Sequence, residues 1–189
     1  LTFFPQVALL VFVDFTSSIT WIRESAIFGS ILLVIGSLML VITALWALHE
    51  KNVKRLLGFL VLFETGALLL LLGMQTELTI QTFYLAQIPR FLSIIAASLC
   101  VSIIFGDDSS TPEMAGSFWR YPVASIGLLV SLFSIIGLPP FGEFPYKLIM
   151  INAIGTAQKT NPIWLILGFV GILLPVFGLM KRMFSSDET

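Results

Sequence analysis

The sequence contains few residues that bind metals or form cross-links. It has one cysteine and one histidine among 189 residues. Cys100 stands alone in an apolar run, so the chain cannot form an internal disulfide or a cysteine metal site. A single histidine, His49, rules out a metal site built from several histidines. We therefore expect no metal site in this chain.

Charged residues are also scarce. They make up 11% of the chain, and the formal net charge is −1, whereas soluble domains contain about 25% charged residues. This near-neutral balance offers no basic surface for nucleic acid, so we expect no nucleic-acid partner. Hydrophobic residues reach 57%, and several stretches exceed the roughly 18 apolar residues of a membrane-spanning helix. The sequence predicts a polytopic membrane protein.

The apolar stretches predict the fold class, an all-α integral membrane protein. We expect a helix bundle of about five spans after a short N-terminal apolar segment. It forms a single membrane domain over residues 1–189, with one long polar connecting loop at 106–120. The N-terminal segment lacks the basic start and the cleavage site of a signal peptide. The expected spans are residues 25–48, 56–74, 80–105, 121–157 and 162–180.

The fourth expected span contains a sequence that cannot continue as a regular helix. Pro139 and Pro140 stand between Gly137 and Gly142. Proline lacks a backbone N–H and clashes with the preceding helical turn. We therefore predict a discontinuous helix broken at Pro139–Pro140. Discontinuous helices of this kind expose half-helix ends that commonly bind ions in transporters.

A basic cluster, formed by Lys51, Lys54 and Arg55, separates two apolar runs and predicts one membrane surface. Glu64 follows Arg55 by nine residues, which places it about 13 Å further along a helix with a rise of 1.5 Å per residue. It then lies near the middle of the membrane. Ionisable residues at that depth are costly and usually functional, so Glu64 is a candidate proton-relay residue. The alternative is a protonated acid hydrogen-bonded within the bundle.

Three further charged residues fall inside expected spans. Arg90 shares a helix face with Gln87 and Ser93, so we expect it to face protein or a hydrated path. Because arginine does not release its proton in proteins, Arg90 is a candidate fixed counter-charge. Lys147 is either a lysine that extends to the membrane surface or a relay residue. Glu143 is either its partner or a cap of the half-helix.

Charge placement predicts the topology. The basic cluster and Lys181–Arg182, at the end of the last span, are expected on the same, positive side of the membrane. Counting the spans between them places the 106–120 loop on that side as well.

Three stretches resemble the antiporter-like proton-pumping subunits of respiratory complex I. ALWALHEKNVKRLLGFLVLFETG resembles their segment ALxQxDxKRLLAYSSIxHxG, and SLFSIIGLPPFGEFPYKL resembles their broken helix SLxGIPPxxGFxxKxxL. PIWLILGFVGILLPVFGLMKRMF is similar to their closing span. Length and ending are most similar to the C-terminal half of the subunit called N in bacteria and chain 2 in mitochondria. Related subunits occur in Mrp cation/proton antiporters and membrane-bound hydrogenases.

The resemblance extends to individual residues. Lys54–Arg55 match the family's Lys-Arg pair, and Lys147 matches the lysine after the broken helix, a proposed relay residue. Glu64 stands where the family has a histidine. Leu92 occupies about the place of the family's central lysine, with Arg90 two residues away.

The resemblance implies a membrane subunit of a proton-pumping NADH:quinone oxidoreductase, with no catalytic centre and no cofactor of its own. Flavin mononucleotide, iron–sulfur clusters and quinone would belong to partner subunits. The expected partners are other complex I membrane subunits, a companion N-terminal half, and lipid. The expected location is the mitochondrial inner membrane or the bacterial plasma membrane. The alternatives are a non-conducting scaffold subunit of the same complex, or part of an Mrp-type antiporter or membrane-bound hydrogenase. The transported ion is H⁺ or Na⁺.

Overall fold

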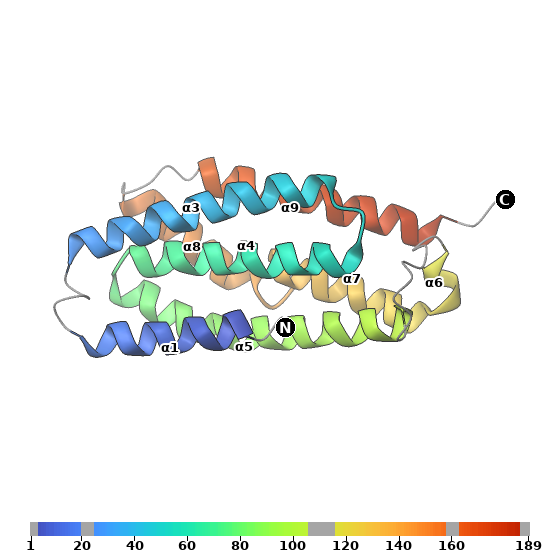
Figure 1. Ribbon diagram of the computed structural model, residues 1–189, viewed down its shortest axis with the longest axis horizontal. Coiled ribbons are helices and arrows are strands. Elements are labelled where there is room, and N and C mark those ends of the chain that lie inside the picture. The colour runs from blue at the N-terminus through green and yellow to red at the C-terminus, as the bar shows by residue number, and fades with distance from the viewer. Residues whose placement is uncertain (1–3, 20–24, 106–115, 158–162, 186–189) are drawn as a thin grey trace.

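The computed structural model describes residues 4–19, 25–105, 116–157 and 163–185, which form helices and connections without a strand. Figure 1 shows the long helices running side by side along the molecule. The helices are α1 (Phe4–Ser18), α3 (Ala26–His49), α4 (Val53–Gly73), α5 (Glu77–Phe105), α6 (Ser117–Arg120), α7 (Pro122–Ile136), α8 (Phe144–Ala157) and α9 (Ile163–Phe184).

The expected fold class is confirmed. Four helices in the described part of the chain are long and apolar enough to cross a membrane: α3, α4, α5 and the Leu165–Phe184 part of α9. The shorter apolar helix α7 precedes the predicted break, and α8 follows it. The protein is a multi-pass membrane protein with an interrupted span.

Local sequence explains where the helices begin and end. The Asn52 side chain caps α4 by accepting hydrogen bonds from the backbone N–H groups of Lys54 and Arg55, which would otherwise lack helical partners. Helix α7 ends at Ile136 and is capped by Gly137, whose φ of 79° is left-handed and therefore favours glycine. Pro139 and Pro140 follow, so the helix cannot resume at once. Pro89, by contrast, lies inside the single helix α5.

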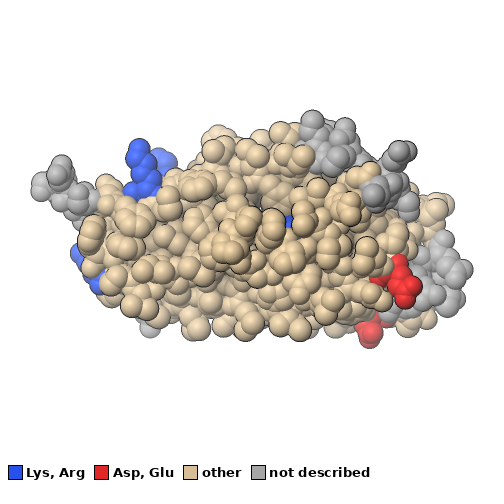
Figure 2. All heavy atoms as spheres, turned by 180° about the vertical axis from the view of Figure 1, so that it is seen from behind, with Lys and Arg blue, Asp and Glu red and all other residues tan. Residues whose placement is uncertain are grey.

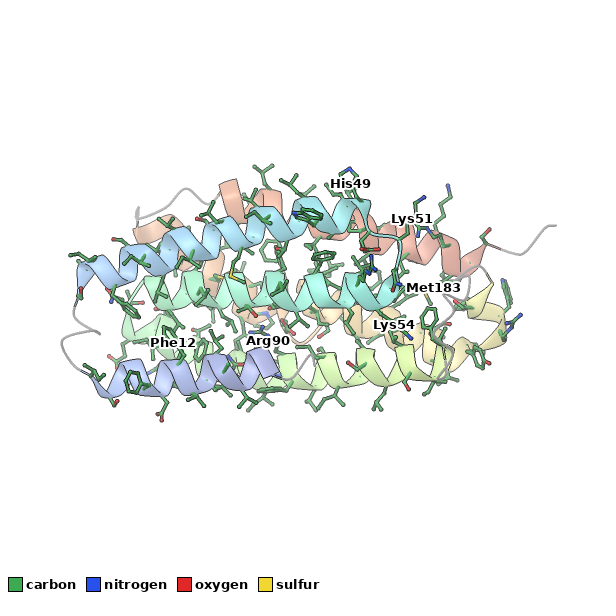
Figure 3. All side chains as sticks on the ribbon, viewed as in Figure 1. Phe12, His49, Lys51, Lys54, Arg90 and Met183 are labelled. Carbon is green, nitrogen blue, oxygen red and sulfur yellow. The ribbon has the colours of Figure 1, made fainter. Side chains whose placement is uncertain are left out.

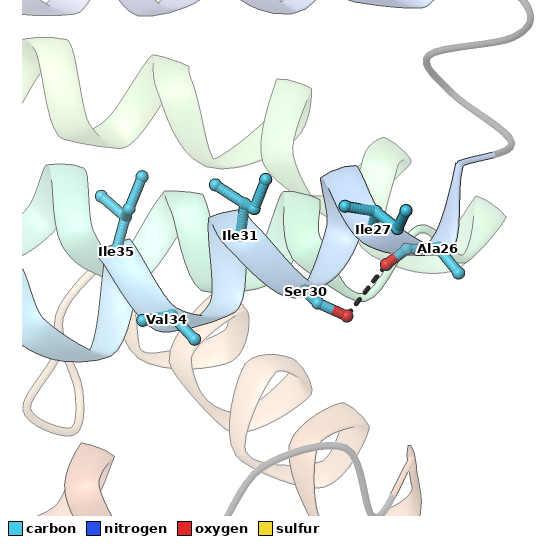
Figure 4. Close-up of a pocket in the computed structure, with 6 residues that line it drawn as sticks. All are labelled: Ala26, Ile27, Ser30, Ile31, Val34 and Ile35. Carbon is cyan, nitrogen blue, oxygen red and sulfur yellow. Dashed lines mark hydrogen bonds between the residues drawn. The ribbon is translucent and has the colours of Figure 1, made fainter.

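Helix α4 lies at the centre of the bundle. It contacts α3, α5 and α9, and nearly all of its residues from Val53 to Gly73 are buried or half-buried. Helix α3 has far more exposed surface. Its outer face forms an apolar groove lined by Ala26, Ile27, Ser30, Ile31, Val34 and Ile35 (Figure 4). In a membrane, such a face suits lipid chains or another apolar helix.

The two basic segments, which the charge placement predicts on one side of the membrane, lie near the same end of the bundle. Figure 3 places His49, Lys51, Lys54 and Met183 near the same end of the bundle, and Arg182 Nη1 donates to the Lys51 carbonyl at 3.3 Å. Figure 2, which shows the molecule from behind, has basic side chains near one end and acidic ones near the other. Helix α6 lies at the basic end (Figure 1). Residues 106–115 of the predicted loop lie outside the described residues, and residues 117–120 form α6 rather than loop.

Helices α3 and α4 pack backbone against backbone through two lines of glycine. A Cβ on Gly36 would lie 2.8 Å from the Gly66 carbonyl oxygen. A Cβ on Gly73 would lie 2.9 Å from the Gly29 carbonyl oxygen. Small residues permit this close approach, which provides van der Waals contact between helices in lipid. The α3–α4 pair thus fixes the position of the central helix.

The glycine contact predicts the effect of a bulky substitution. Gly66→Leu should destabilise the protein by about 1–3 kcal/mol, because inserted atoms must force the two backbones apart. The matched control is Gly58→Leu on the same helix, where a Cβ would meet nothing within 4 Å. Thermal unfolding of the detergent-solubilised protein should show a lower midpoint for Gly66→Leu only. Equal midpoints for the two variants would contradict the prediction.

Candidate functional site

An ion pair between Glu64 and Lys147 lies at the centre of the candidate site. Glu64 comes from α4 and Lys147 from the first turns of α8, 83 residues later. The Lys147 ammonium donates a hydrogen bond to Glu64 Oε1. The two residues are only 2% and 7% exposed. A buried charge in a membrane protein needs a partner of opposite sign, and each of these residues supplies it for the other.

Two further charges complete what we call the charge cluster, which consists of Glu64, Arg90, Glu143 and Lys147. Arg90 is 1% exposed and Glu143 is 3% exposed. Glu143 Oε2 lies 3.9 Å from the Lys147 Nζ, one helical turn away. Arg90 is attracted electrostatically by both carboxylates. The formal charges of two acids and two bases cancel, which lowers the cost of burying the cluster inside the bundle.

Arg90 is held by polar groups of α4. Its Nη2 donates to Thr65 Oγ1 at 3.1 Å and to the Val61 carbonyl at 3.4 Å. Figure 3 places Arg90 near the middle of the bundle's length, far from Lys54 at the end. Leu92, by contrast, is 64% exposed on the outer face of α5. Arg90 therefore takes the inward position that Leu92 does not.

The helix break places Lys147 and Glu143 at this depth. The connection between α7 and α8 lies near the middle of the bundle (Figure 1). A Cβ on Gly137 would lie 2.5 Å from Lys147 Cγ, and one on Gly142 would lie 3.5 Å from Pro89 Cβ. Glycine at 137 lets the lysine stem approach the break closely, whereas a Cβ at 142 would make only an ordinary van der Waals contact with α5. The interruption at Pro139–Pro140 therefore brings α8 and its lysine to Glu64.

The structure brings together most of the candidates from the sequence. Glu64, Lys147, Arg90 and Glu143 meet beside the break formed by Pro139, Pro140 and Gly142. Glu143 is expected from the sequence either as the partner of Lys147 or as a cap of the half-helix. The 3.9 Å distance between Glu143 Oε2 and Lys147 Nζ agrees with the first interpretation. The basic cluster is not part of this site, because Lys51, Lys54 and Arg55 lie at the end of the bundle.

Sequence reasoning missed two sets of contacts near the charge cluster. Ser93 on α5 donates to Ser134 Oγ on α7 at 2.8 Å, and Ser134 lies beside Gly142. The rings of Phe63 and Phe169 lie near the Lys147 ammonium, with centroids 5.9 Å and 5.6 Å from its Nζ. Neither feature has a local sequence signature, because each joins helices far apart in the chain.

Several known proteins are similar to this chain in sequence. Residues 2–175 match the family model described as NADH:quinone oxidoreductase/Mrp antiporter, transmembrane. The chain is 26% identical to NADH-quinone oxidoreductase subunit N of Wolbachia sp. subsp. Brugia malayi over 90% of its own length and 35% of that protein.

Relatives also come from fungi and other bacteria. The chain is 28% identical to NADH-ubiquinone oxidoreductase chain 2 of Rhizopus oryzae, covering 93% of this chain and 35% of the relative. It is 24% identical to a putative antiporter subunit, mnhD2, of Staphylococcus aureus, and the match covers 86% of this chain and 32% of the relative. The chain thus spans about a third of the length of these relatives.

The ion pair predicts a strong interaction between Glu64 and Lys147. Lys147→Met should destabilise the protein by about 3–5 kcal/mol, because it leaves buried carboxylates without their cation. Adding Glu64→Gln should restore part of the loss, since it removes one unpaired charge. Thermal unfolding of the four members of this double-mutant cycle measures the coupling.

Lys181→Met provides the control, because Lys181 is an exposed lysine at the basic end. It should leave the unfolding midpoint near that of the parent protein. Strictly additive effects of Lys147→Met and Glu64→Gln would contradict a direct interaction.

Proposed function

The chain belongs to the NADH:quinone oxidoreductase/Mrp antiporter transmembrane family, and on this basis we propose that it takes part in proton translocation through Glu64 and Lys147. It would do so as a membrane subunit of a proton-pumping NADH:quinone oxidoreductase in an energy-transducing membrane. Relatives named as subunits of such oxidoreductases support this assignment.

One observation carries the proposal, the buried ion pair between a continuous helix and an interrupted one. Ionisable residues within membrane spans are costly and are typical of ion pathways. Interrupted helices are where transporters bind and release ions, because their half-helix ends leave backbone dipoles free. Glu64 on α4 and Lys147 on α8 combine both features.

The four members of the charge cluster have different roles in the proposed relay. Lys147 and Glu64 can each bind and release a proton, so a proton can pass through either. Arg90 keeps its proton and serves as a fixed positive charge facing both carboxylates. Glu143, 3.9 Å from Lys147, supplies a second carboxylate when the Glu64–Lys147 pair separates. Opening and closing of that pair is the step that the rest of the assembly would drive.

Buried polar atoms support a hydrated path beside the charge cluster. Among the described residues, no hydrogen-bond partner serves the Gln87 amide, Arg90 Nε and Nη1, or Glu143 Oε1. Buried polar atoms in folded proteins are nearly always hydrogen-bonded. Water or a neighbouring segment would satisfy these atoms in the assembled complex and continue the path away from Glu143.

The proposed partners follow from the relatives. The energy would come from redox chemistry on other subunits, which would carry the flavin, the iron–sulfur clusters and the quinone site. Because the relatives are about three times as long as the matched region, a companion segment equivalent to their remaining part would complete the pathway. Lipid would cover the exposed apolar faces.

A second candidate function is a non-conducting scaffold subunit of the same complex. It is favoured by Arg90, the inward-facing cation of α5, because an arginine cannot relay a proton by releasing it. The antiporter relative also allows an Mrp-type antiporter or membrane-bound hydrogenase. Proteins that co-purify with the chain in mild detergent separate these assemblies. A flavin and iron–sulfur assembly supports the oxidoreductase, and cation antiporter subunits alone contradict it.

The relay predicts that changes in the ion pair uncouple proton movement from electron transfer. Glu64→Gln and Lys147→Ala should each lower the proton-to-electron ratio in reconstituted vesicles while NADH oxidation continues. Lys147→Arg should lower the proton-to-electron ratio as well, since arginine retains its proton. The ratio is compared at equal amounts of assembled complex.

Lys181→Ala is the matched control, because it removes an exposed lysine at the end of α9. Its ratio should equal that of the parent complex. An unchanged ratio for both Glu64→Gln and Lys147→Ala would leave the scaffold as the better description.

A further inference from the structure

Two aromatic rings approach the Lys147 ammonium in addition to the two carboxylates. We call Phe63 on α4 and Phe169 on α9 the aromatic pair. Their ring centroids lie 5.9 Å and 5.6 Å from Lys147 Nζ. The two rings meet edge to face, with centroids 5.4 Å apart. The ammonium therefore lies between carboxylates and an aromatic pair contributed by two different helices.

Glycine makes room for this arrangement. A Cβ on Gly168 would lie 3.0 Å from Phe63 Cε2, so the ring of Phe63 packs directly against the α9 backbone. Gly137 contacts the stem of Lys147 in the same way. Phe63 is fully buried. The ring of Phe63 and the lysine stem are thus fixed by packing, while the ammonium remains within reach of both kinds of partner.

The face of an aromatic ring attracts a cation within about 6 Å, and the attraction grows when water is excluded. Both ring centroids lie within this distance of Lys147 Nζ even while the ammonium is hydrogen-bonded to Glu64. Small rotations at the end of the lysine side chain would bring the ammonium closer to the rings. The aromatic pair can therefore hold the cation after it leaves Glu64.

We propose that Phe63 and Phe169 form a second binding position for the Lys147 ammonium, occupied when the Glu64–Lys147 ion pair opens. The inference rests on the proposed relay role of Lys147. The move transfers no proton, since the ammonium keeps all three and only changes neighbours. Two charged groups contact the ammonium, Glu64 from α4 and Glu143 from the break. Arg90 from α5 interacts electrostatically with both of these acids. The rings supply attraction without a proton acceptor, so Phe63 and Phe169 act as positioning residues.

The test is to replace Phe169 by fluorinated phenylalanines in the intact complex. Successive fluorines withdraw electron density from the ring face with little change in shape. We expect the proton-to-electron ratio to fall with each added fluorine, by at least about twofold for trifluorophenylalanine, since the cation–π attraction is removed. Phe169→Leu should lower the ratio as well, and Phe169→Trp, which offers the strongest ring face, should retain it.

Phe177 is the matched control, because it lies on the same helix and packs against Phe133 rather than a cation. Fluorination there should leave the ratio unchanged. If Lys147→Ala lowers the ratio but fluorination of Phe169 does not, the proposed second binding position is contradicted while the proposed relay is retained. If Lys147→Ala also leaves the ratio unchanged, the relay itself fails. A loss with Phe169→Leu but no graded response to fluorine assigns Phe169 to packing and overturns the proposal.

Discussion

The buried ion pair between Glu64 and Lys147 determines much of this structure. A lysine in the middle of a membrane bundle is stable only with a partner close by, and Glu64 supplies that partner from the most buried helix. For Lys147 to reach it, the chain must enter the bundle centre between two half-helices. The left-handed Gly137 and the proline pair provide that entry.

Close helix packing places the acid where the lysine arrives. The glycines of α3 and α4 bring the two backbones together. Helix α9 packs mainly against α3, where a Cβ on Gly171 would lie 2.8 Å from Ala44 Cβ. In lipid, helices associate through such contacts rather than through hydrophobic burial. The small residues therefore act indirectly on the charge cluster, because they fix the helix that carries Glu64.

Much of the fold could be predicted from the sequence, because it depends on local signals. Apolar length defines the spans, and Pro139–Pro140 defines the break. The inward orientation of Glu64, Arg90 and Lys147 follows from the cost of a charge in lipid. The partners could not be predicted in this way. The contact of Lys147 with Glu64 and the approach of Phe169 depend on how α4, α8 and α9 pack. Pro89 lies inside the expected span 80–105, and α5 continues through it.

The resemblance places a histidine of the family at position 64, and a glutamate there gives the site different electrostatics. A neutral histidine beside Lys147 would leave two cations, Arg90 and Lys147, facing Glu143 alone. With Glu64 the formal positive and negative charges balance, and Lys147 has a carboxylate partner in the closed ion pair. Opening the pair then exposes a separated carboxylate and ammonium, which low-dielectric surroundings disfavour. Any group that lowers the cost of that open state controls how often it forms. The ring centroids of the aromatic pair lie 5.9 Å and 5.6 Å from the ammonium. Their faces attract a cation without accepting a proton, and this is why the rings are suited to that role.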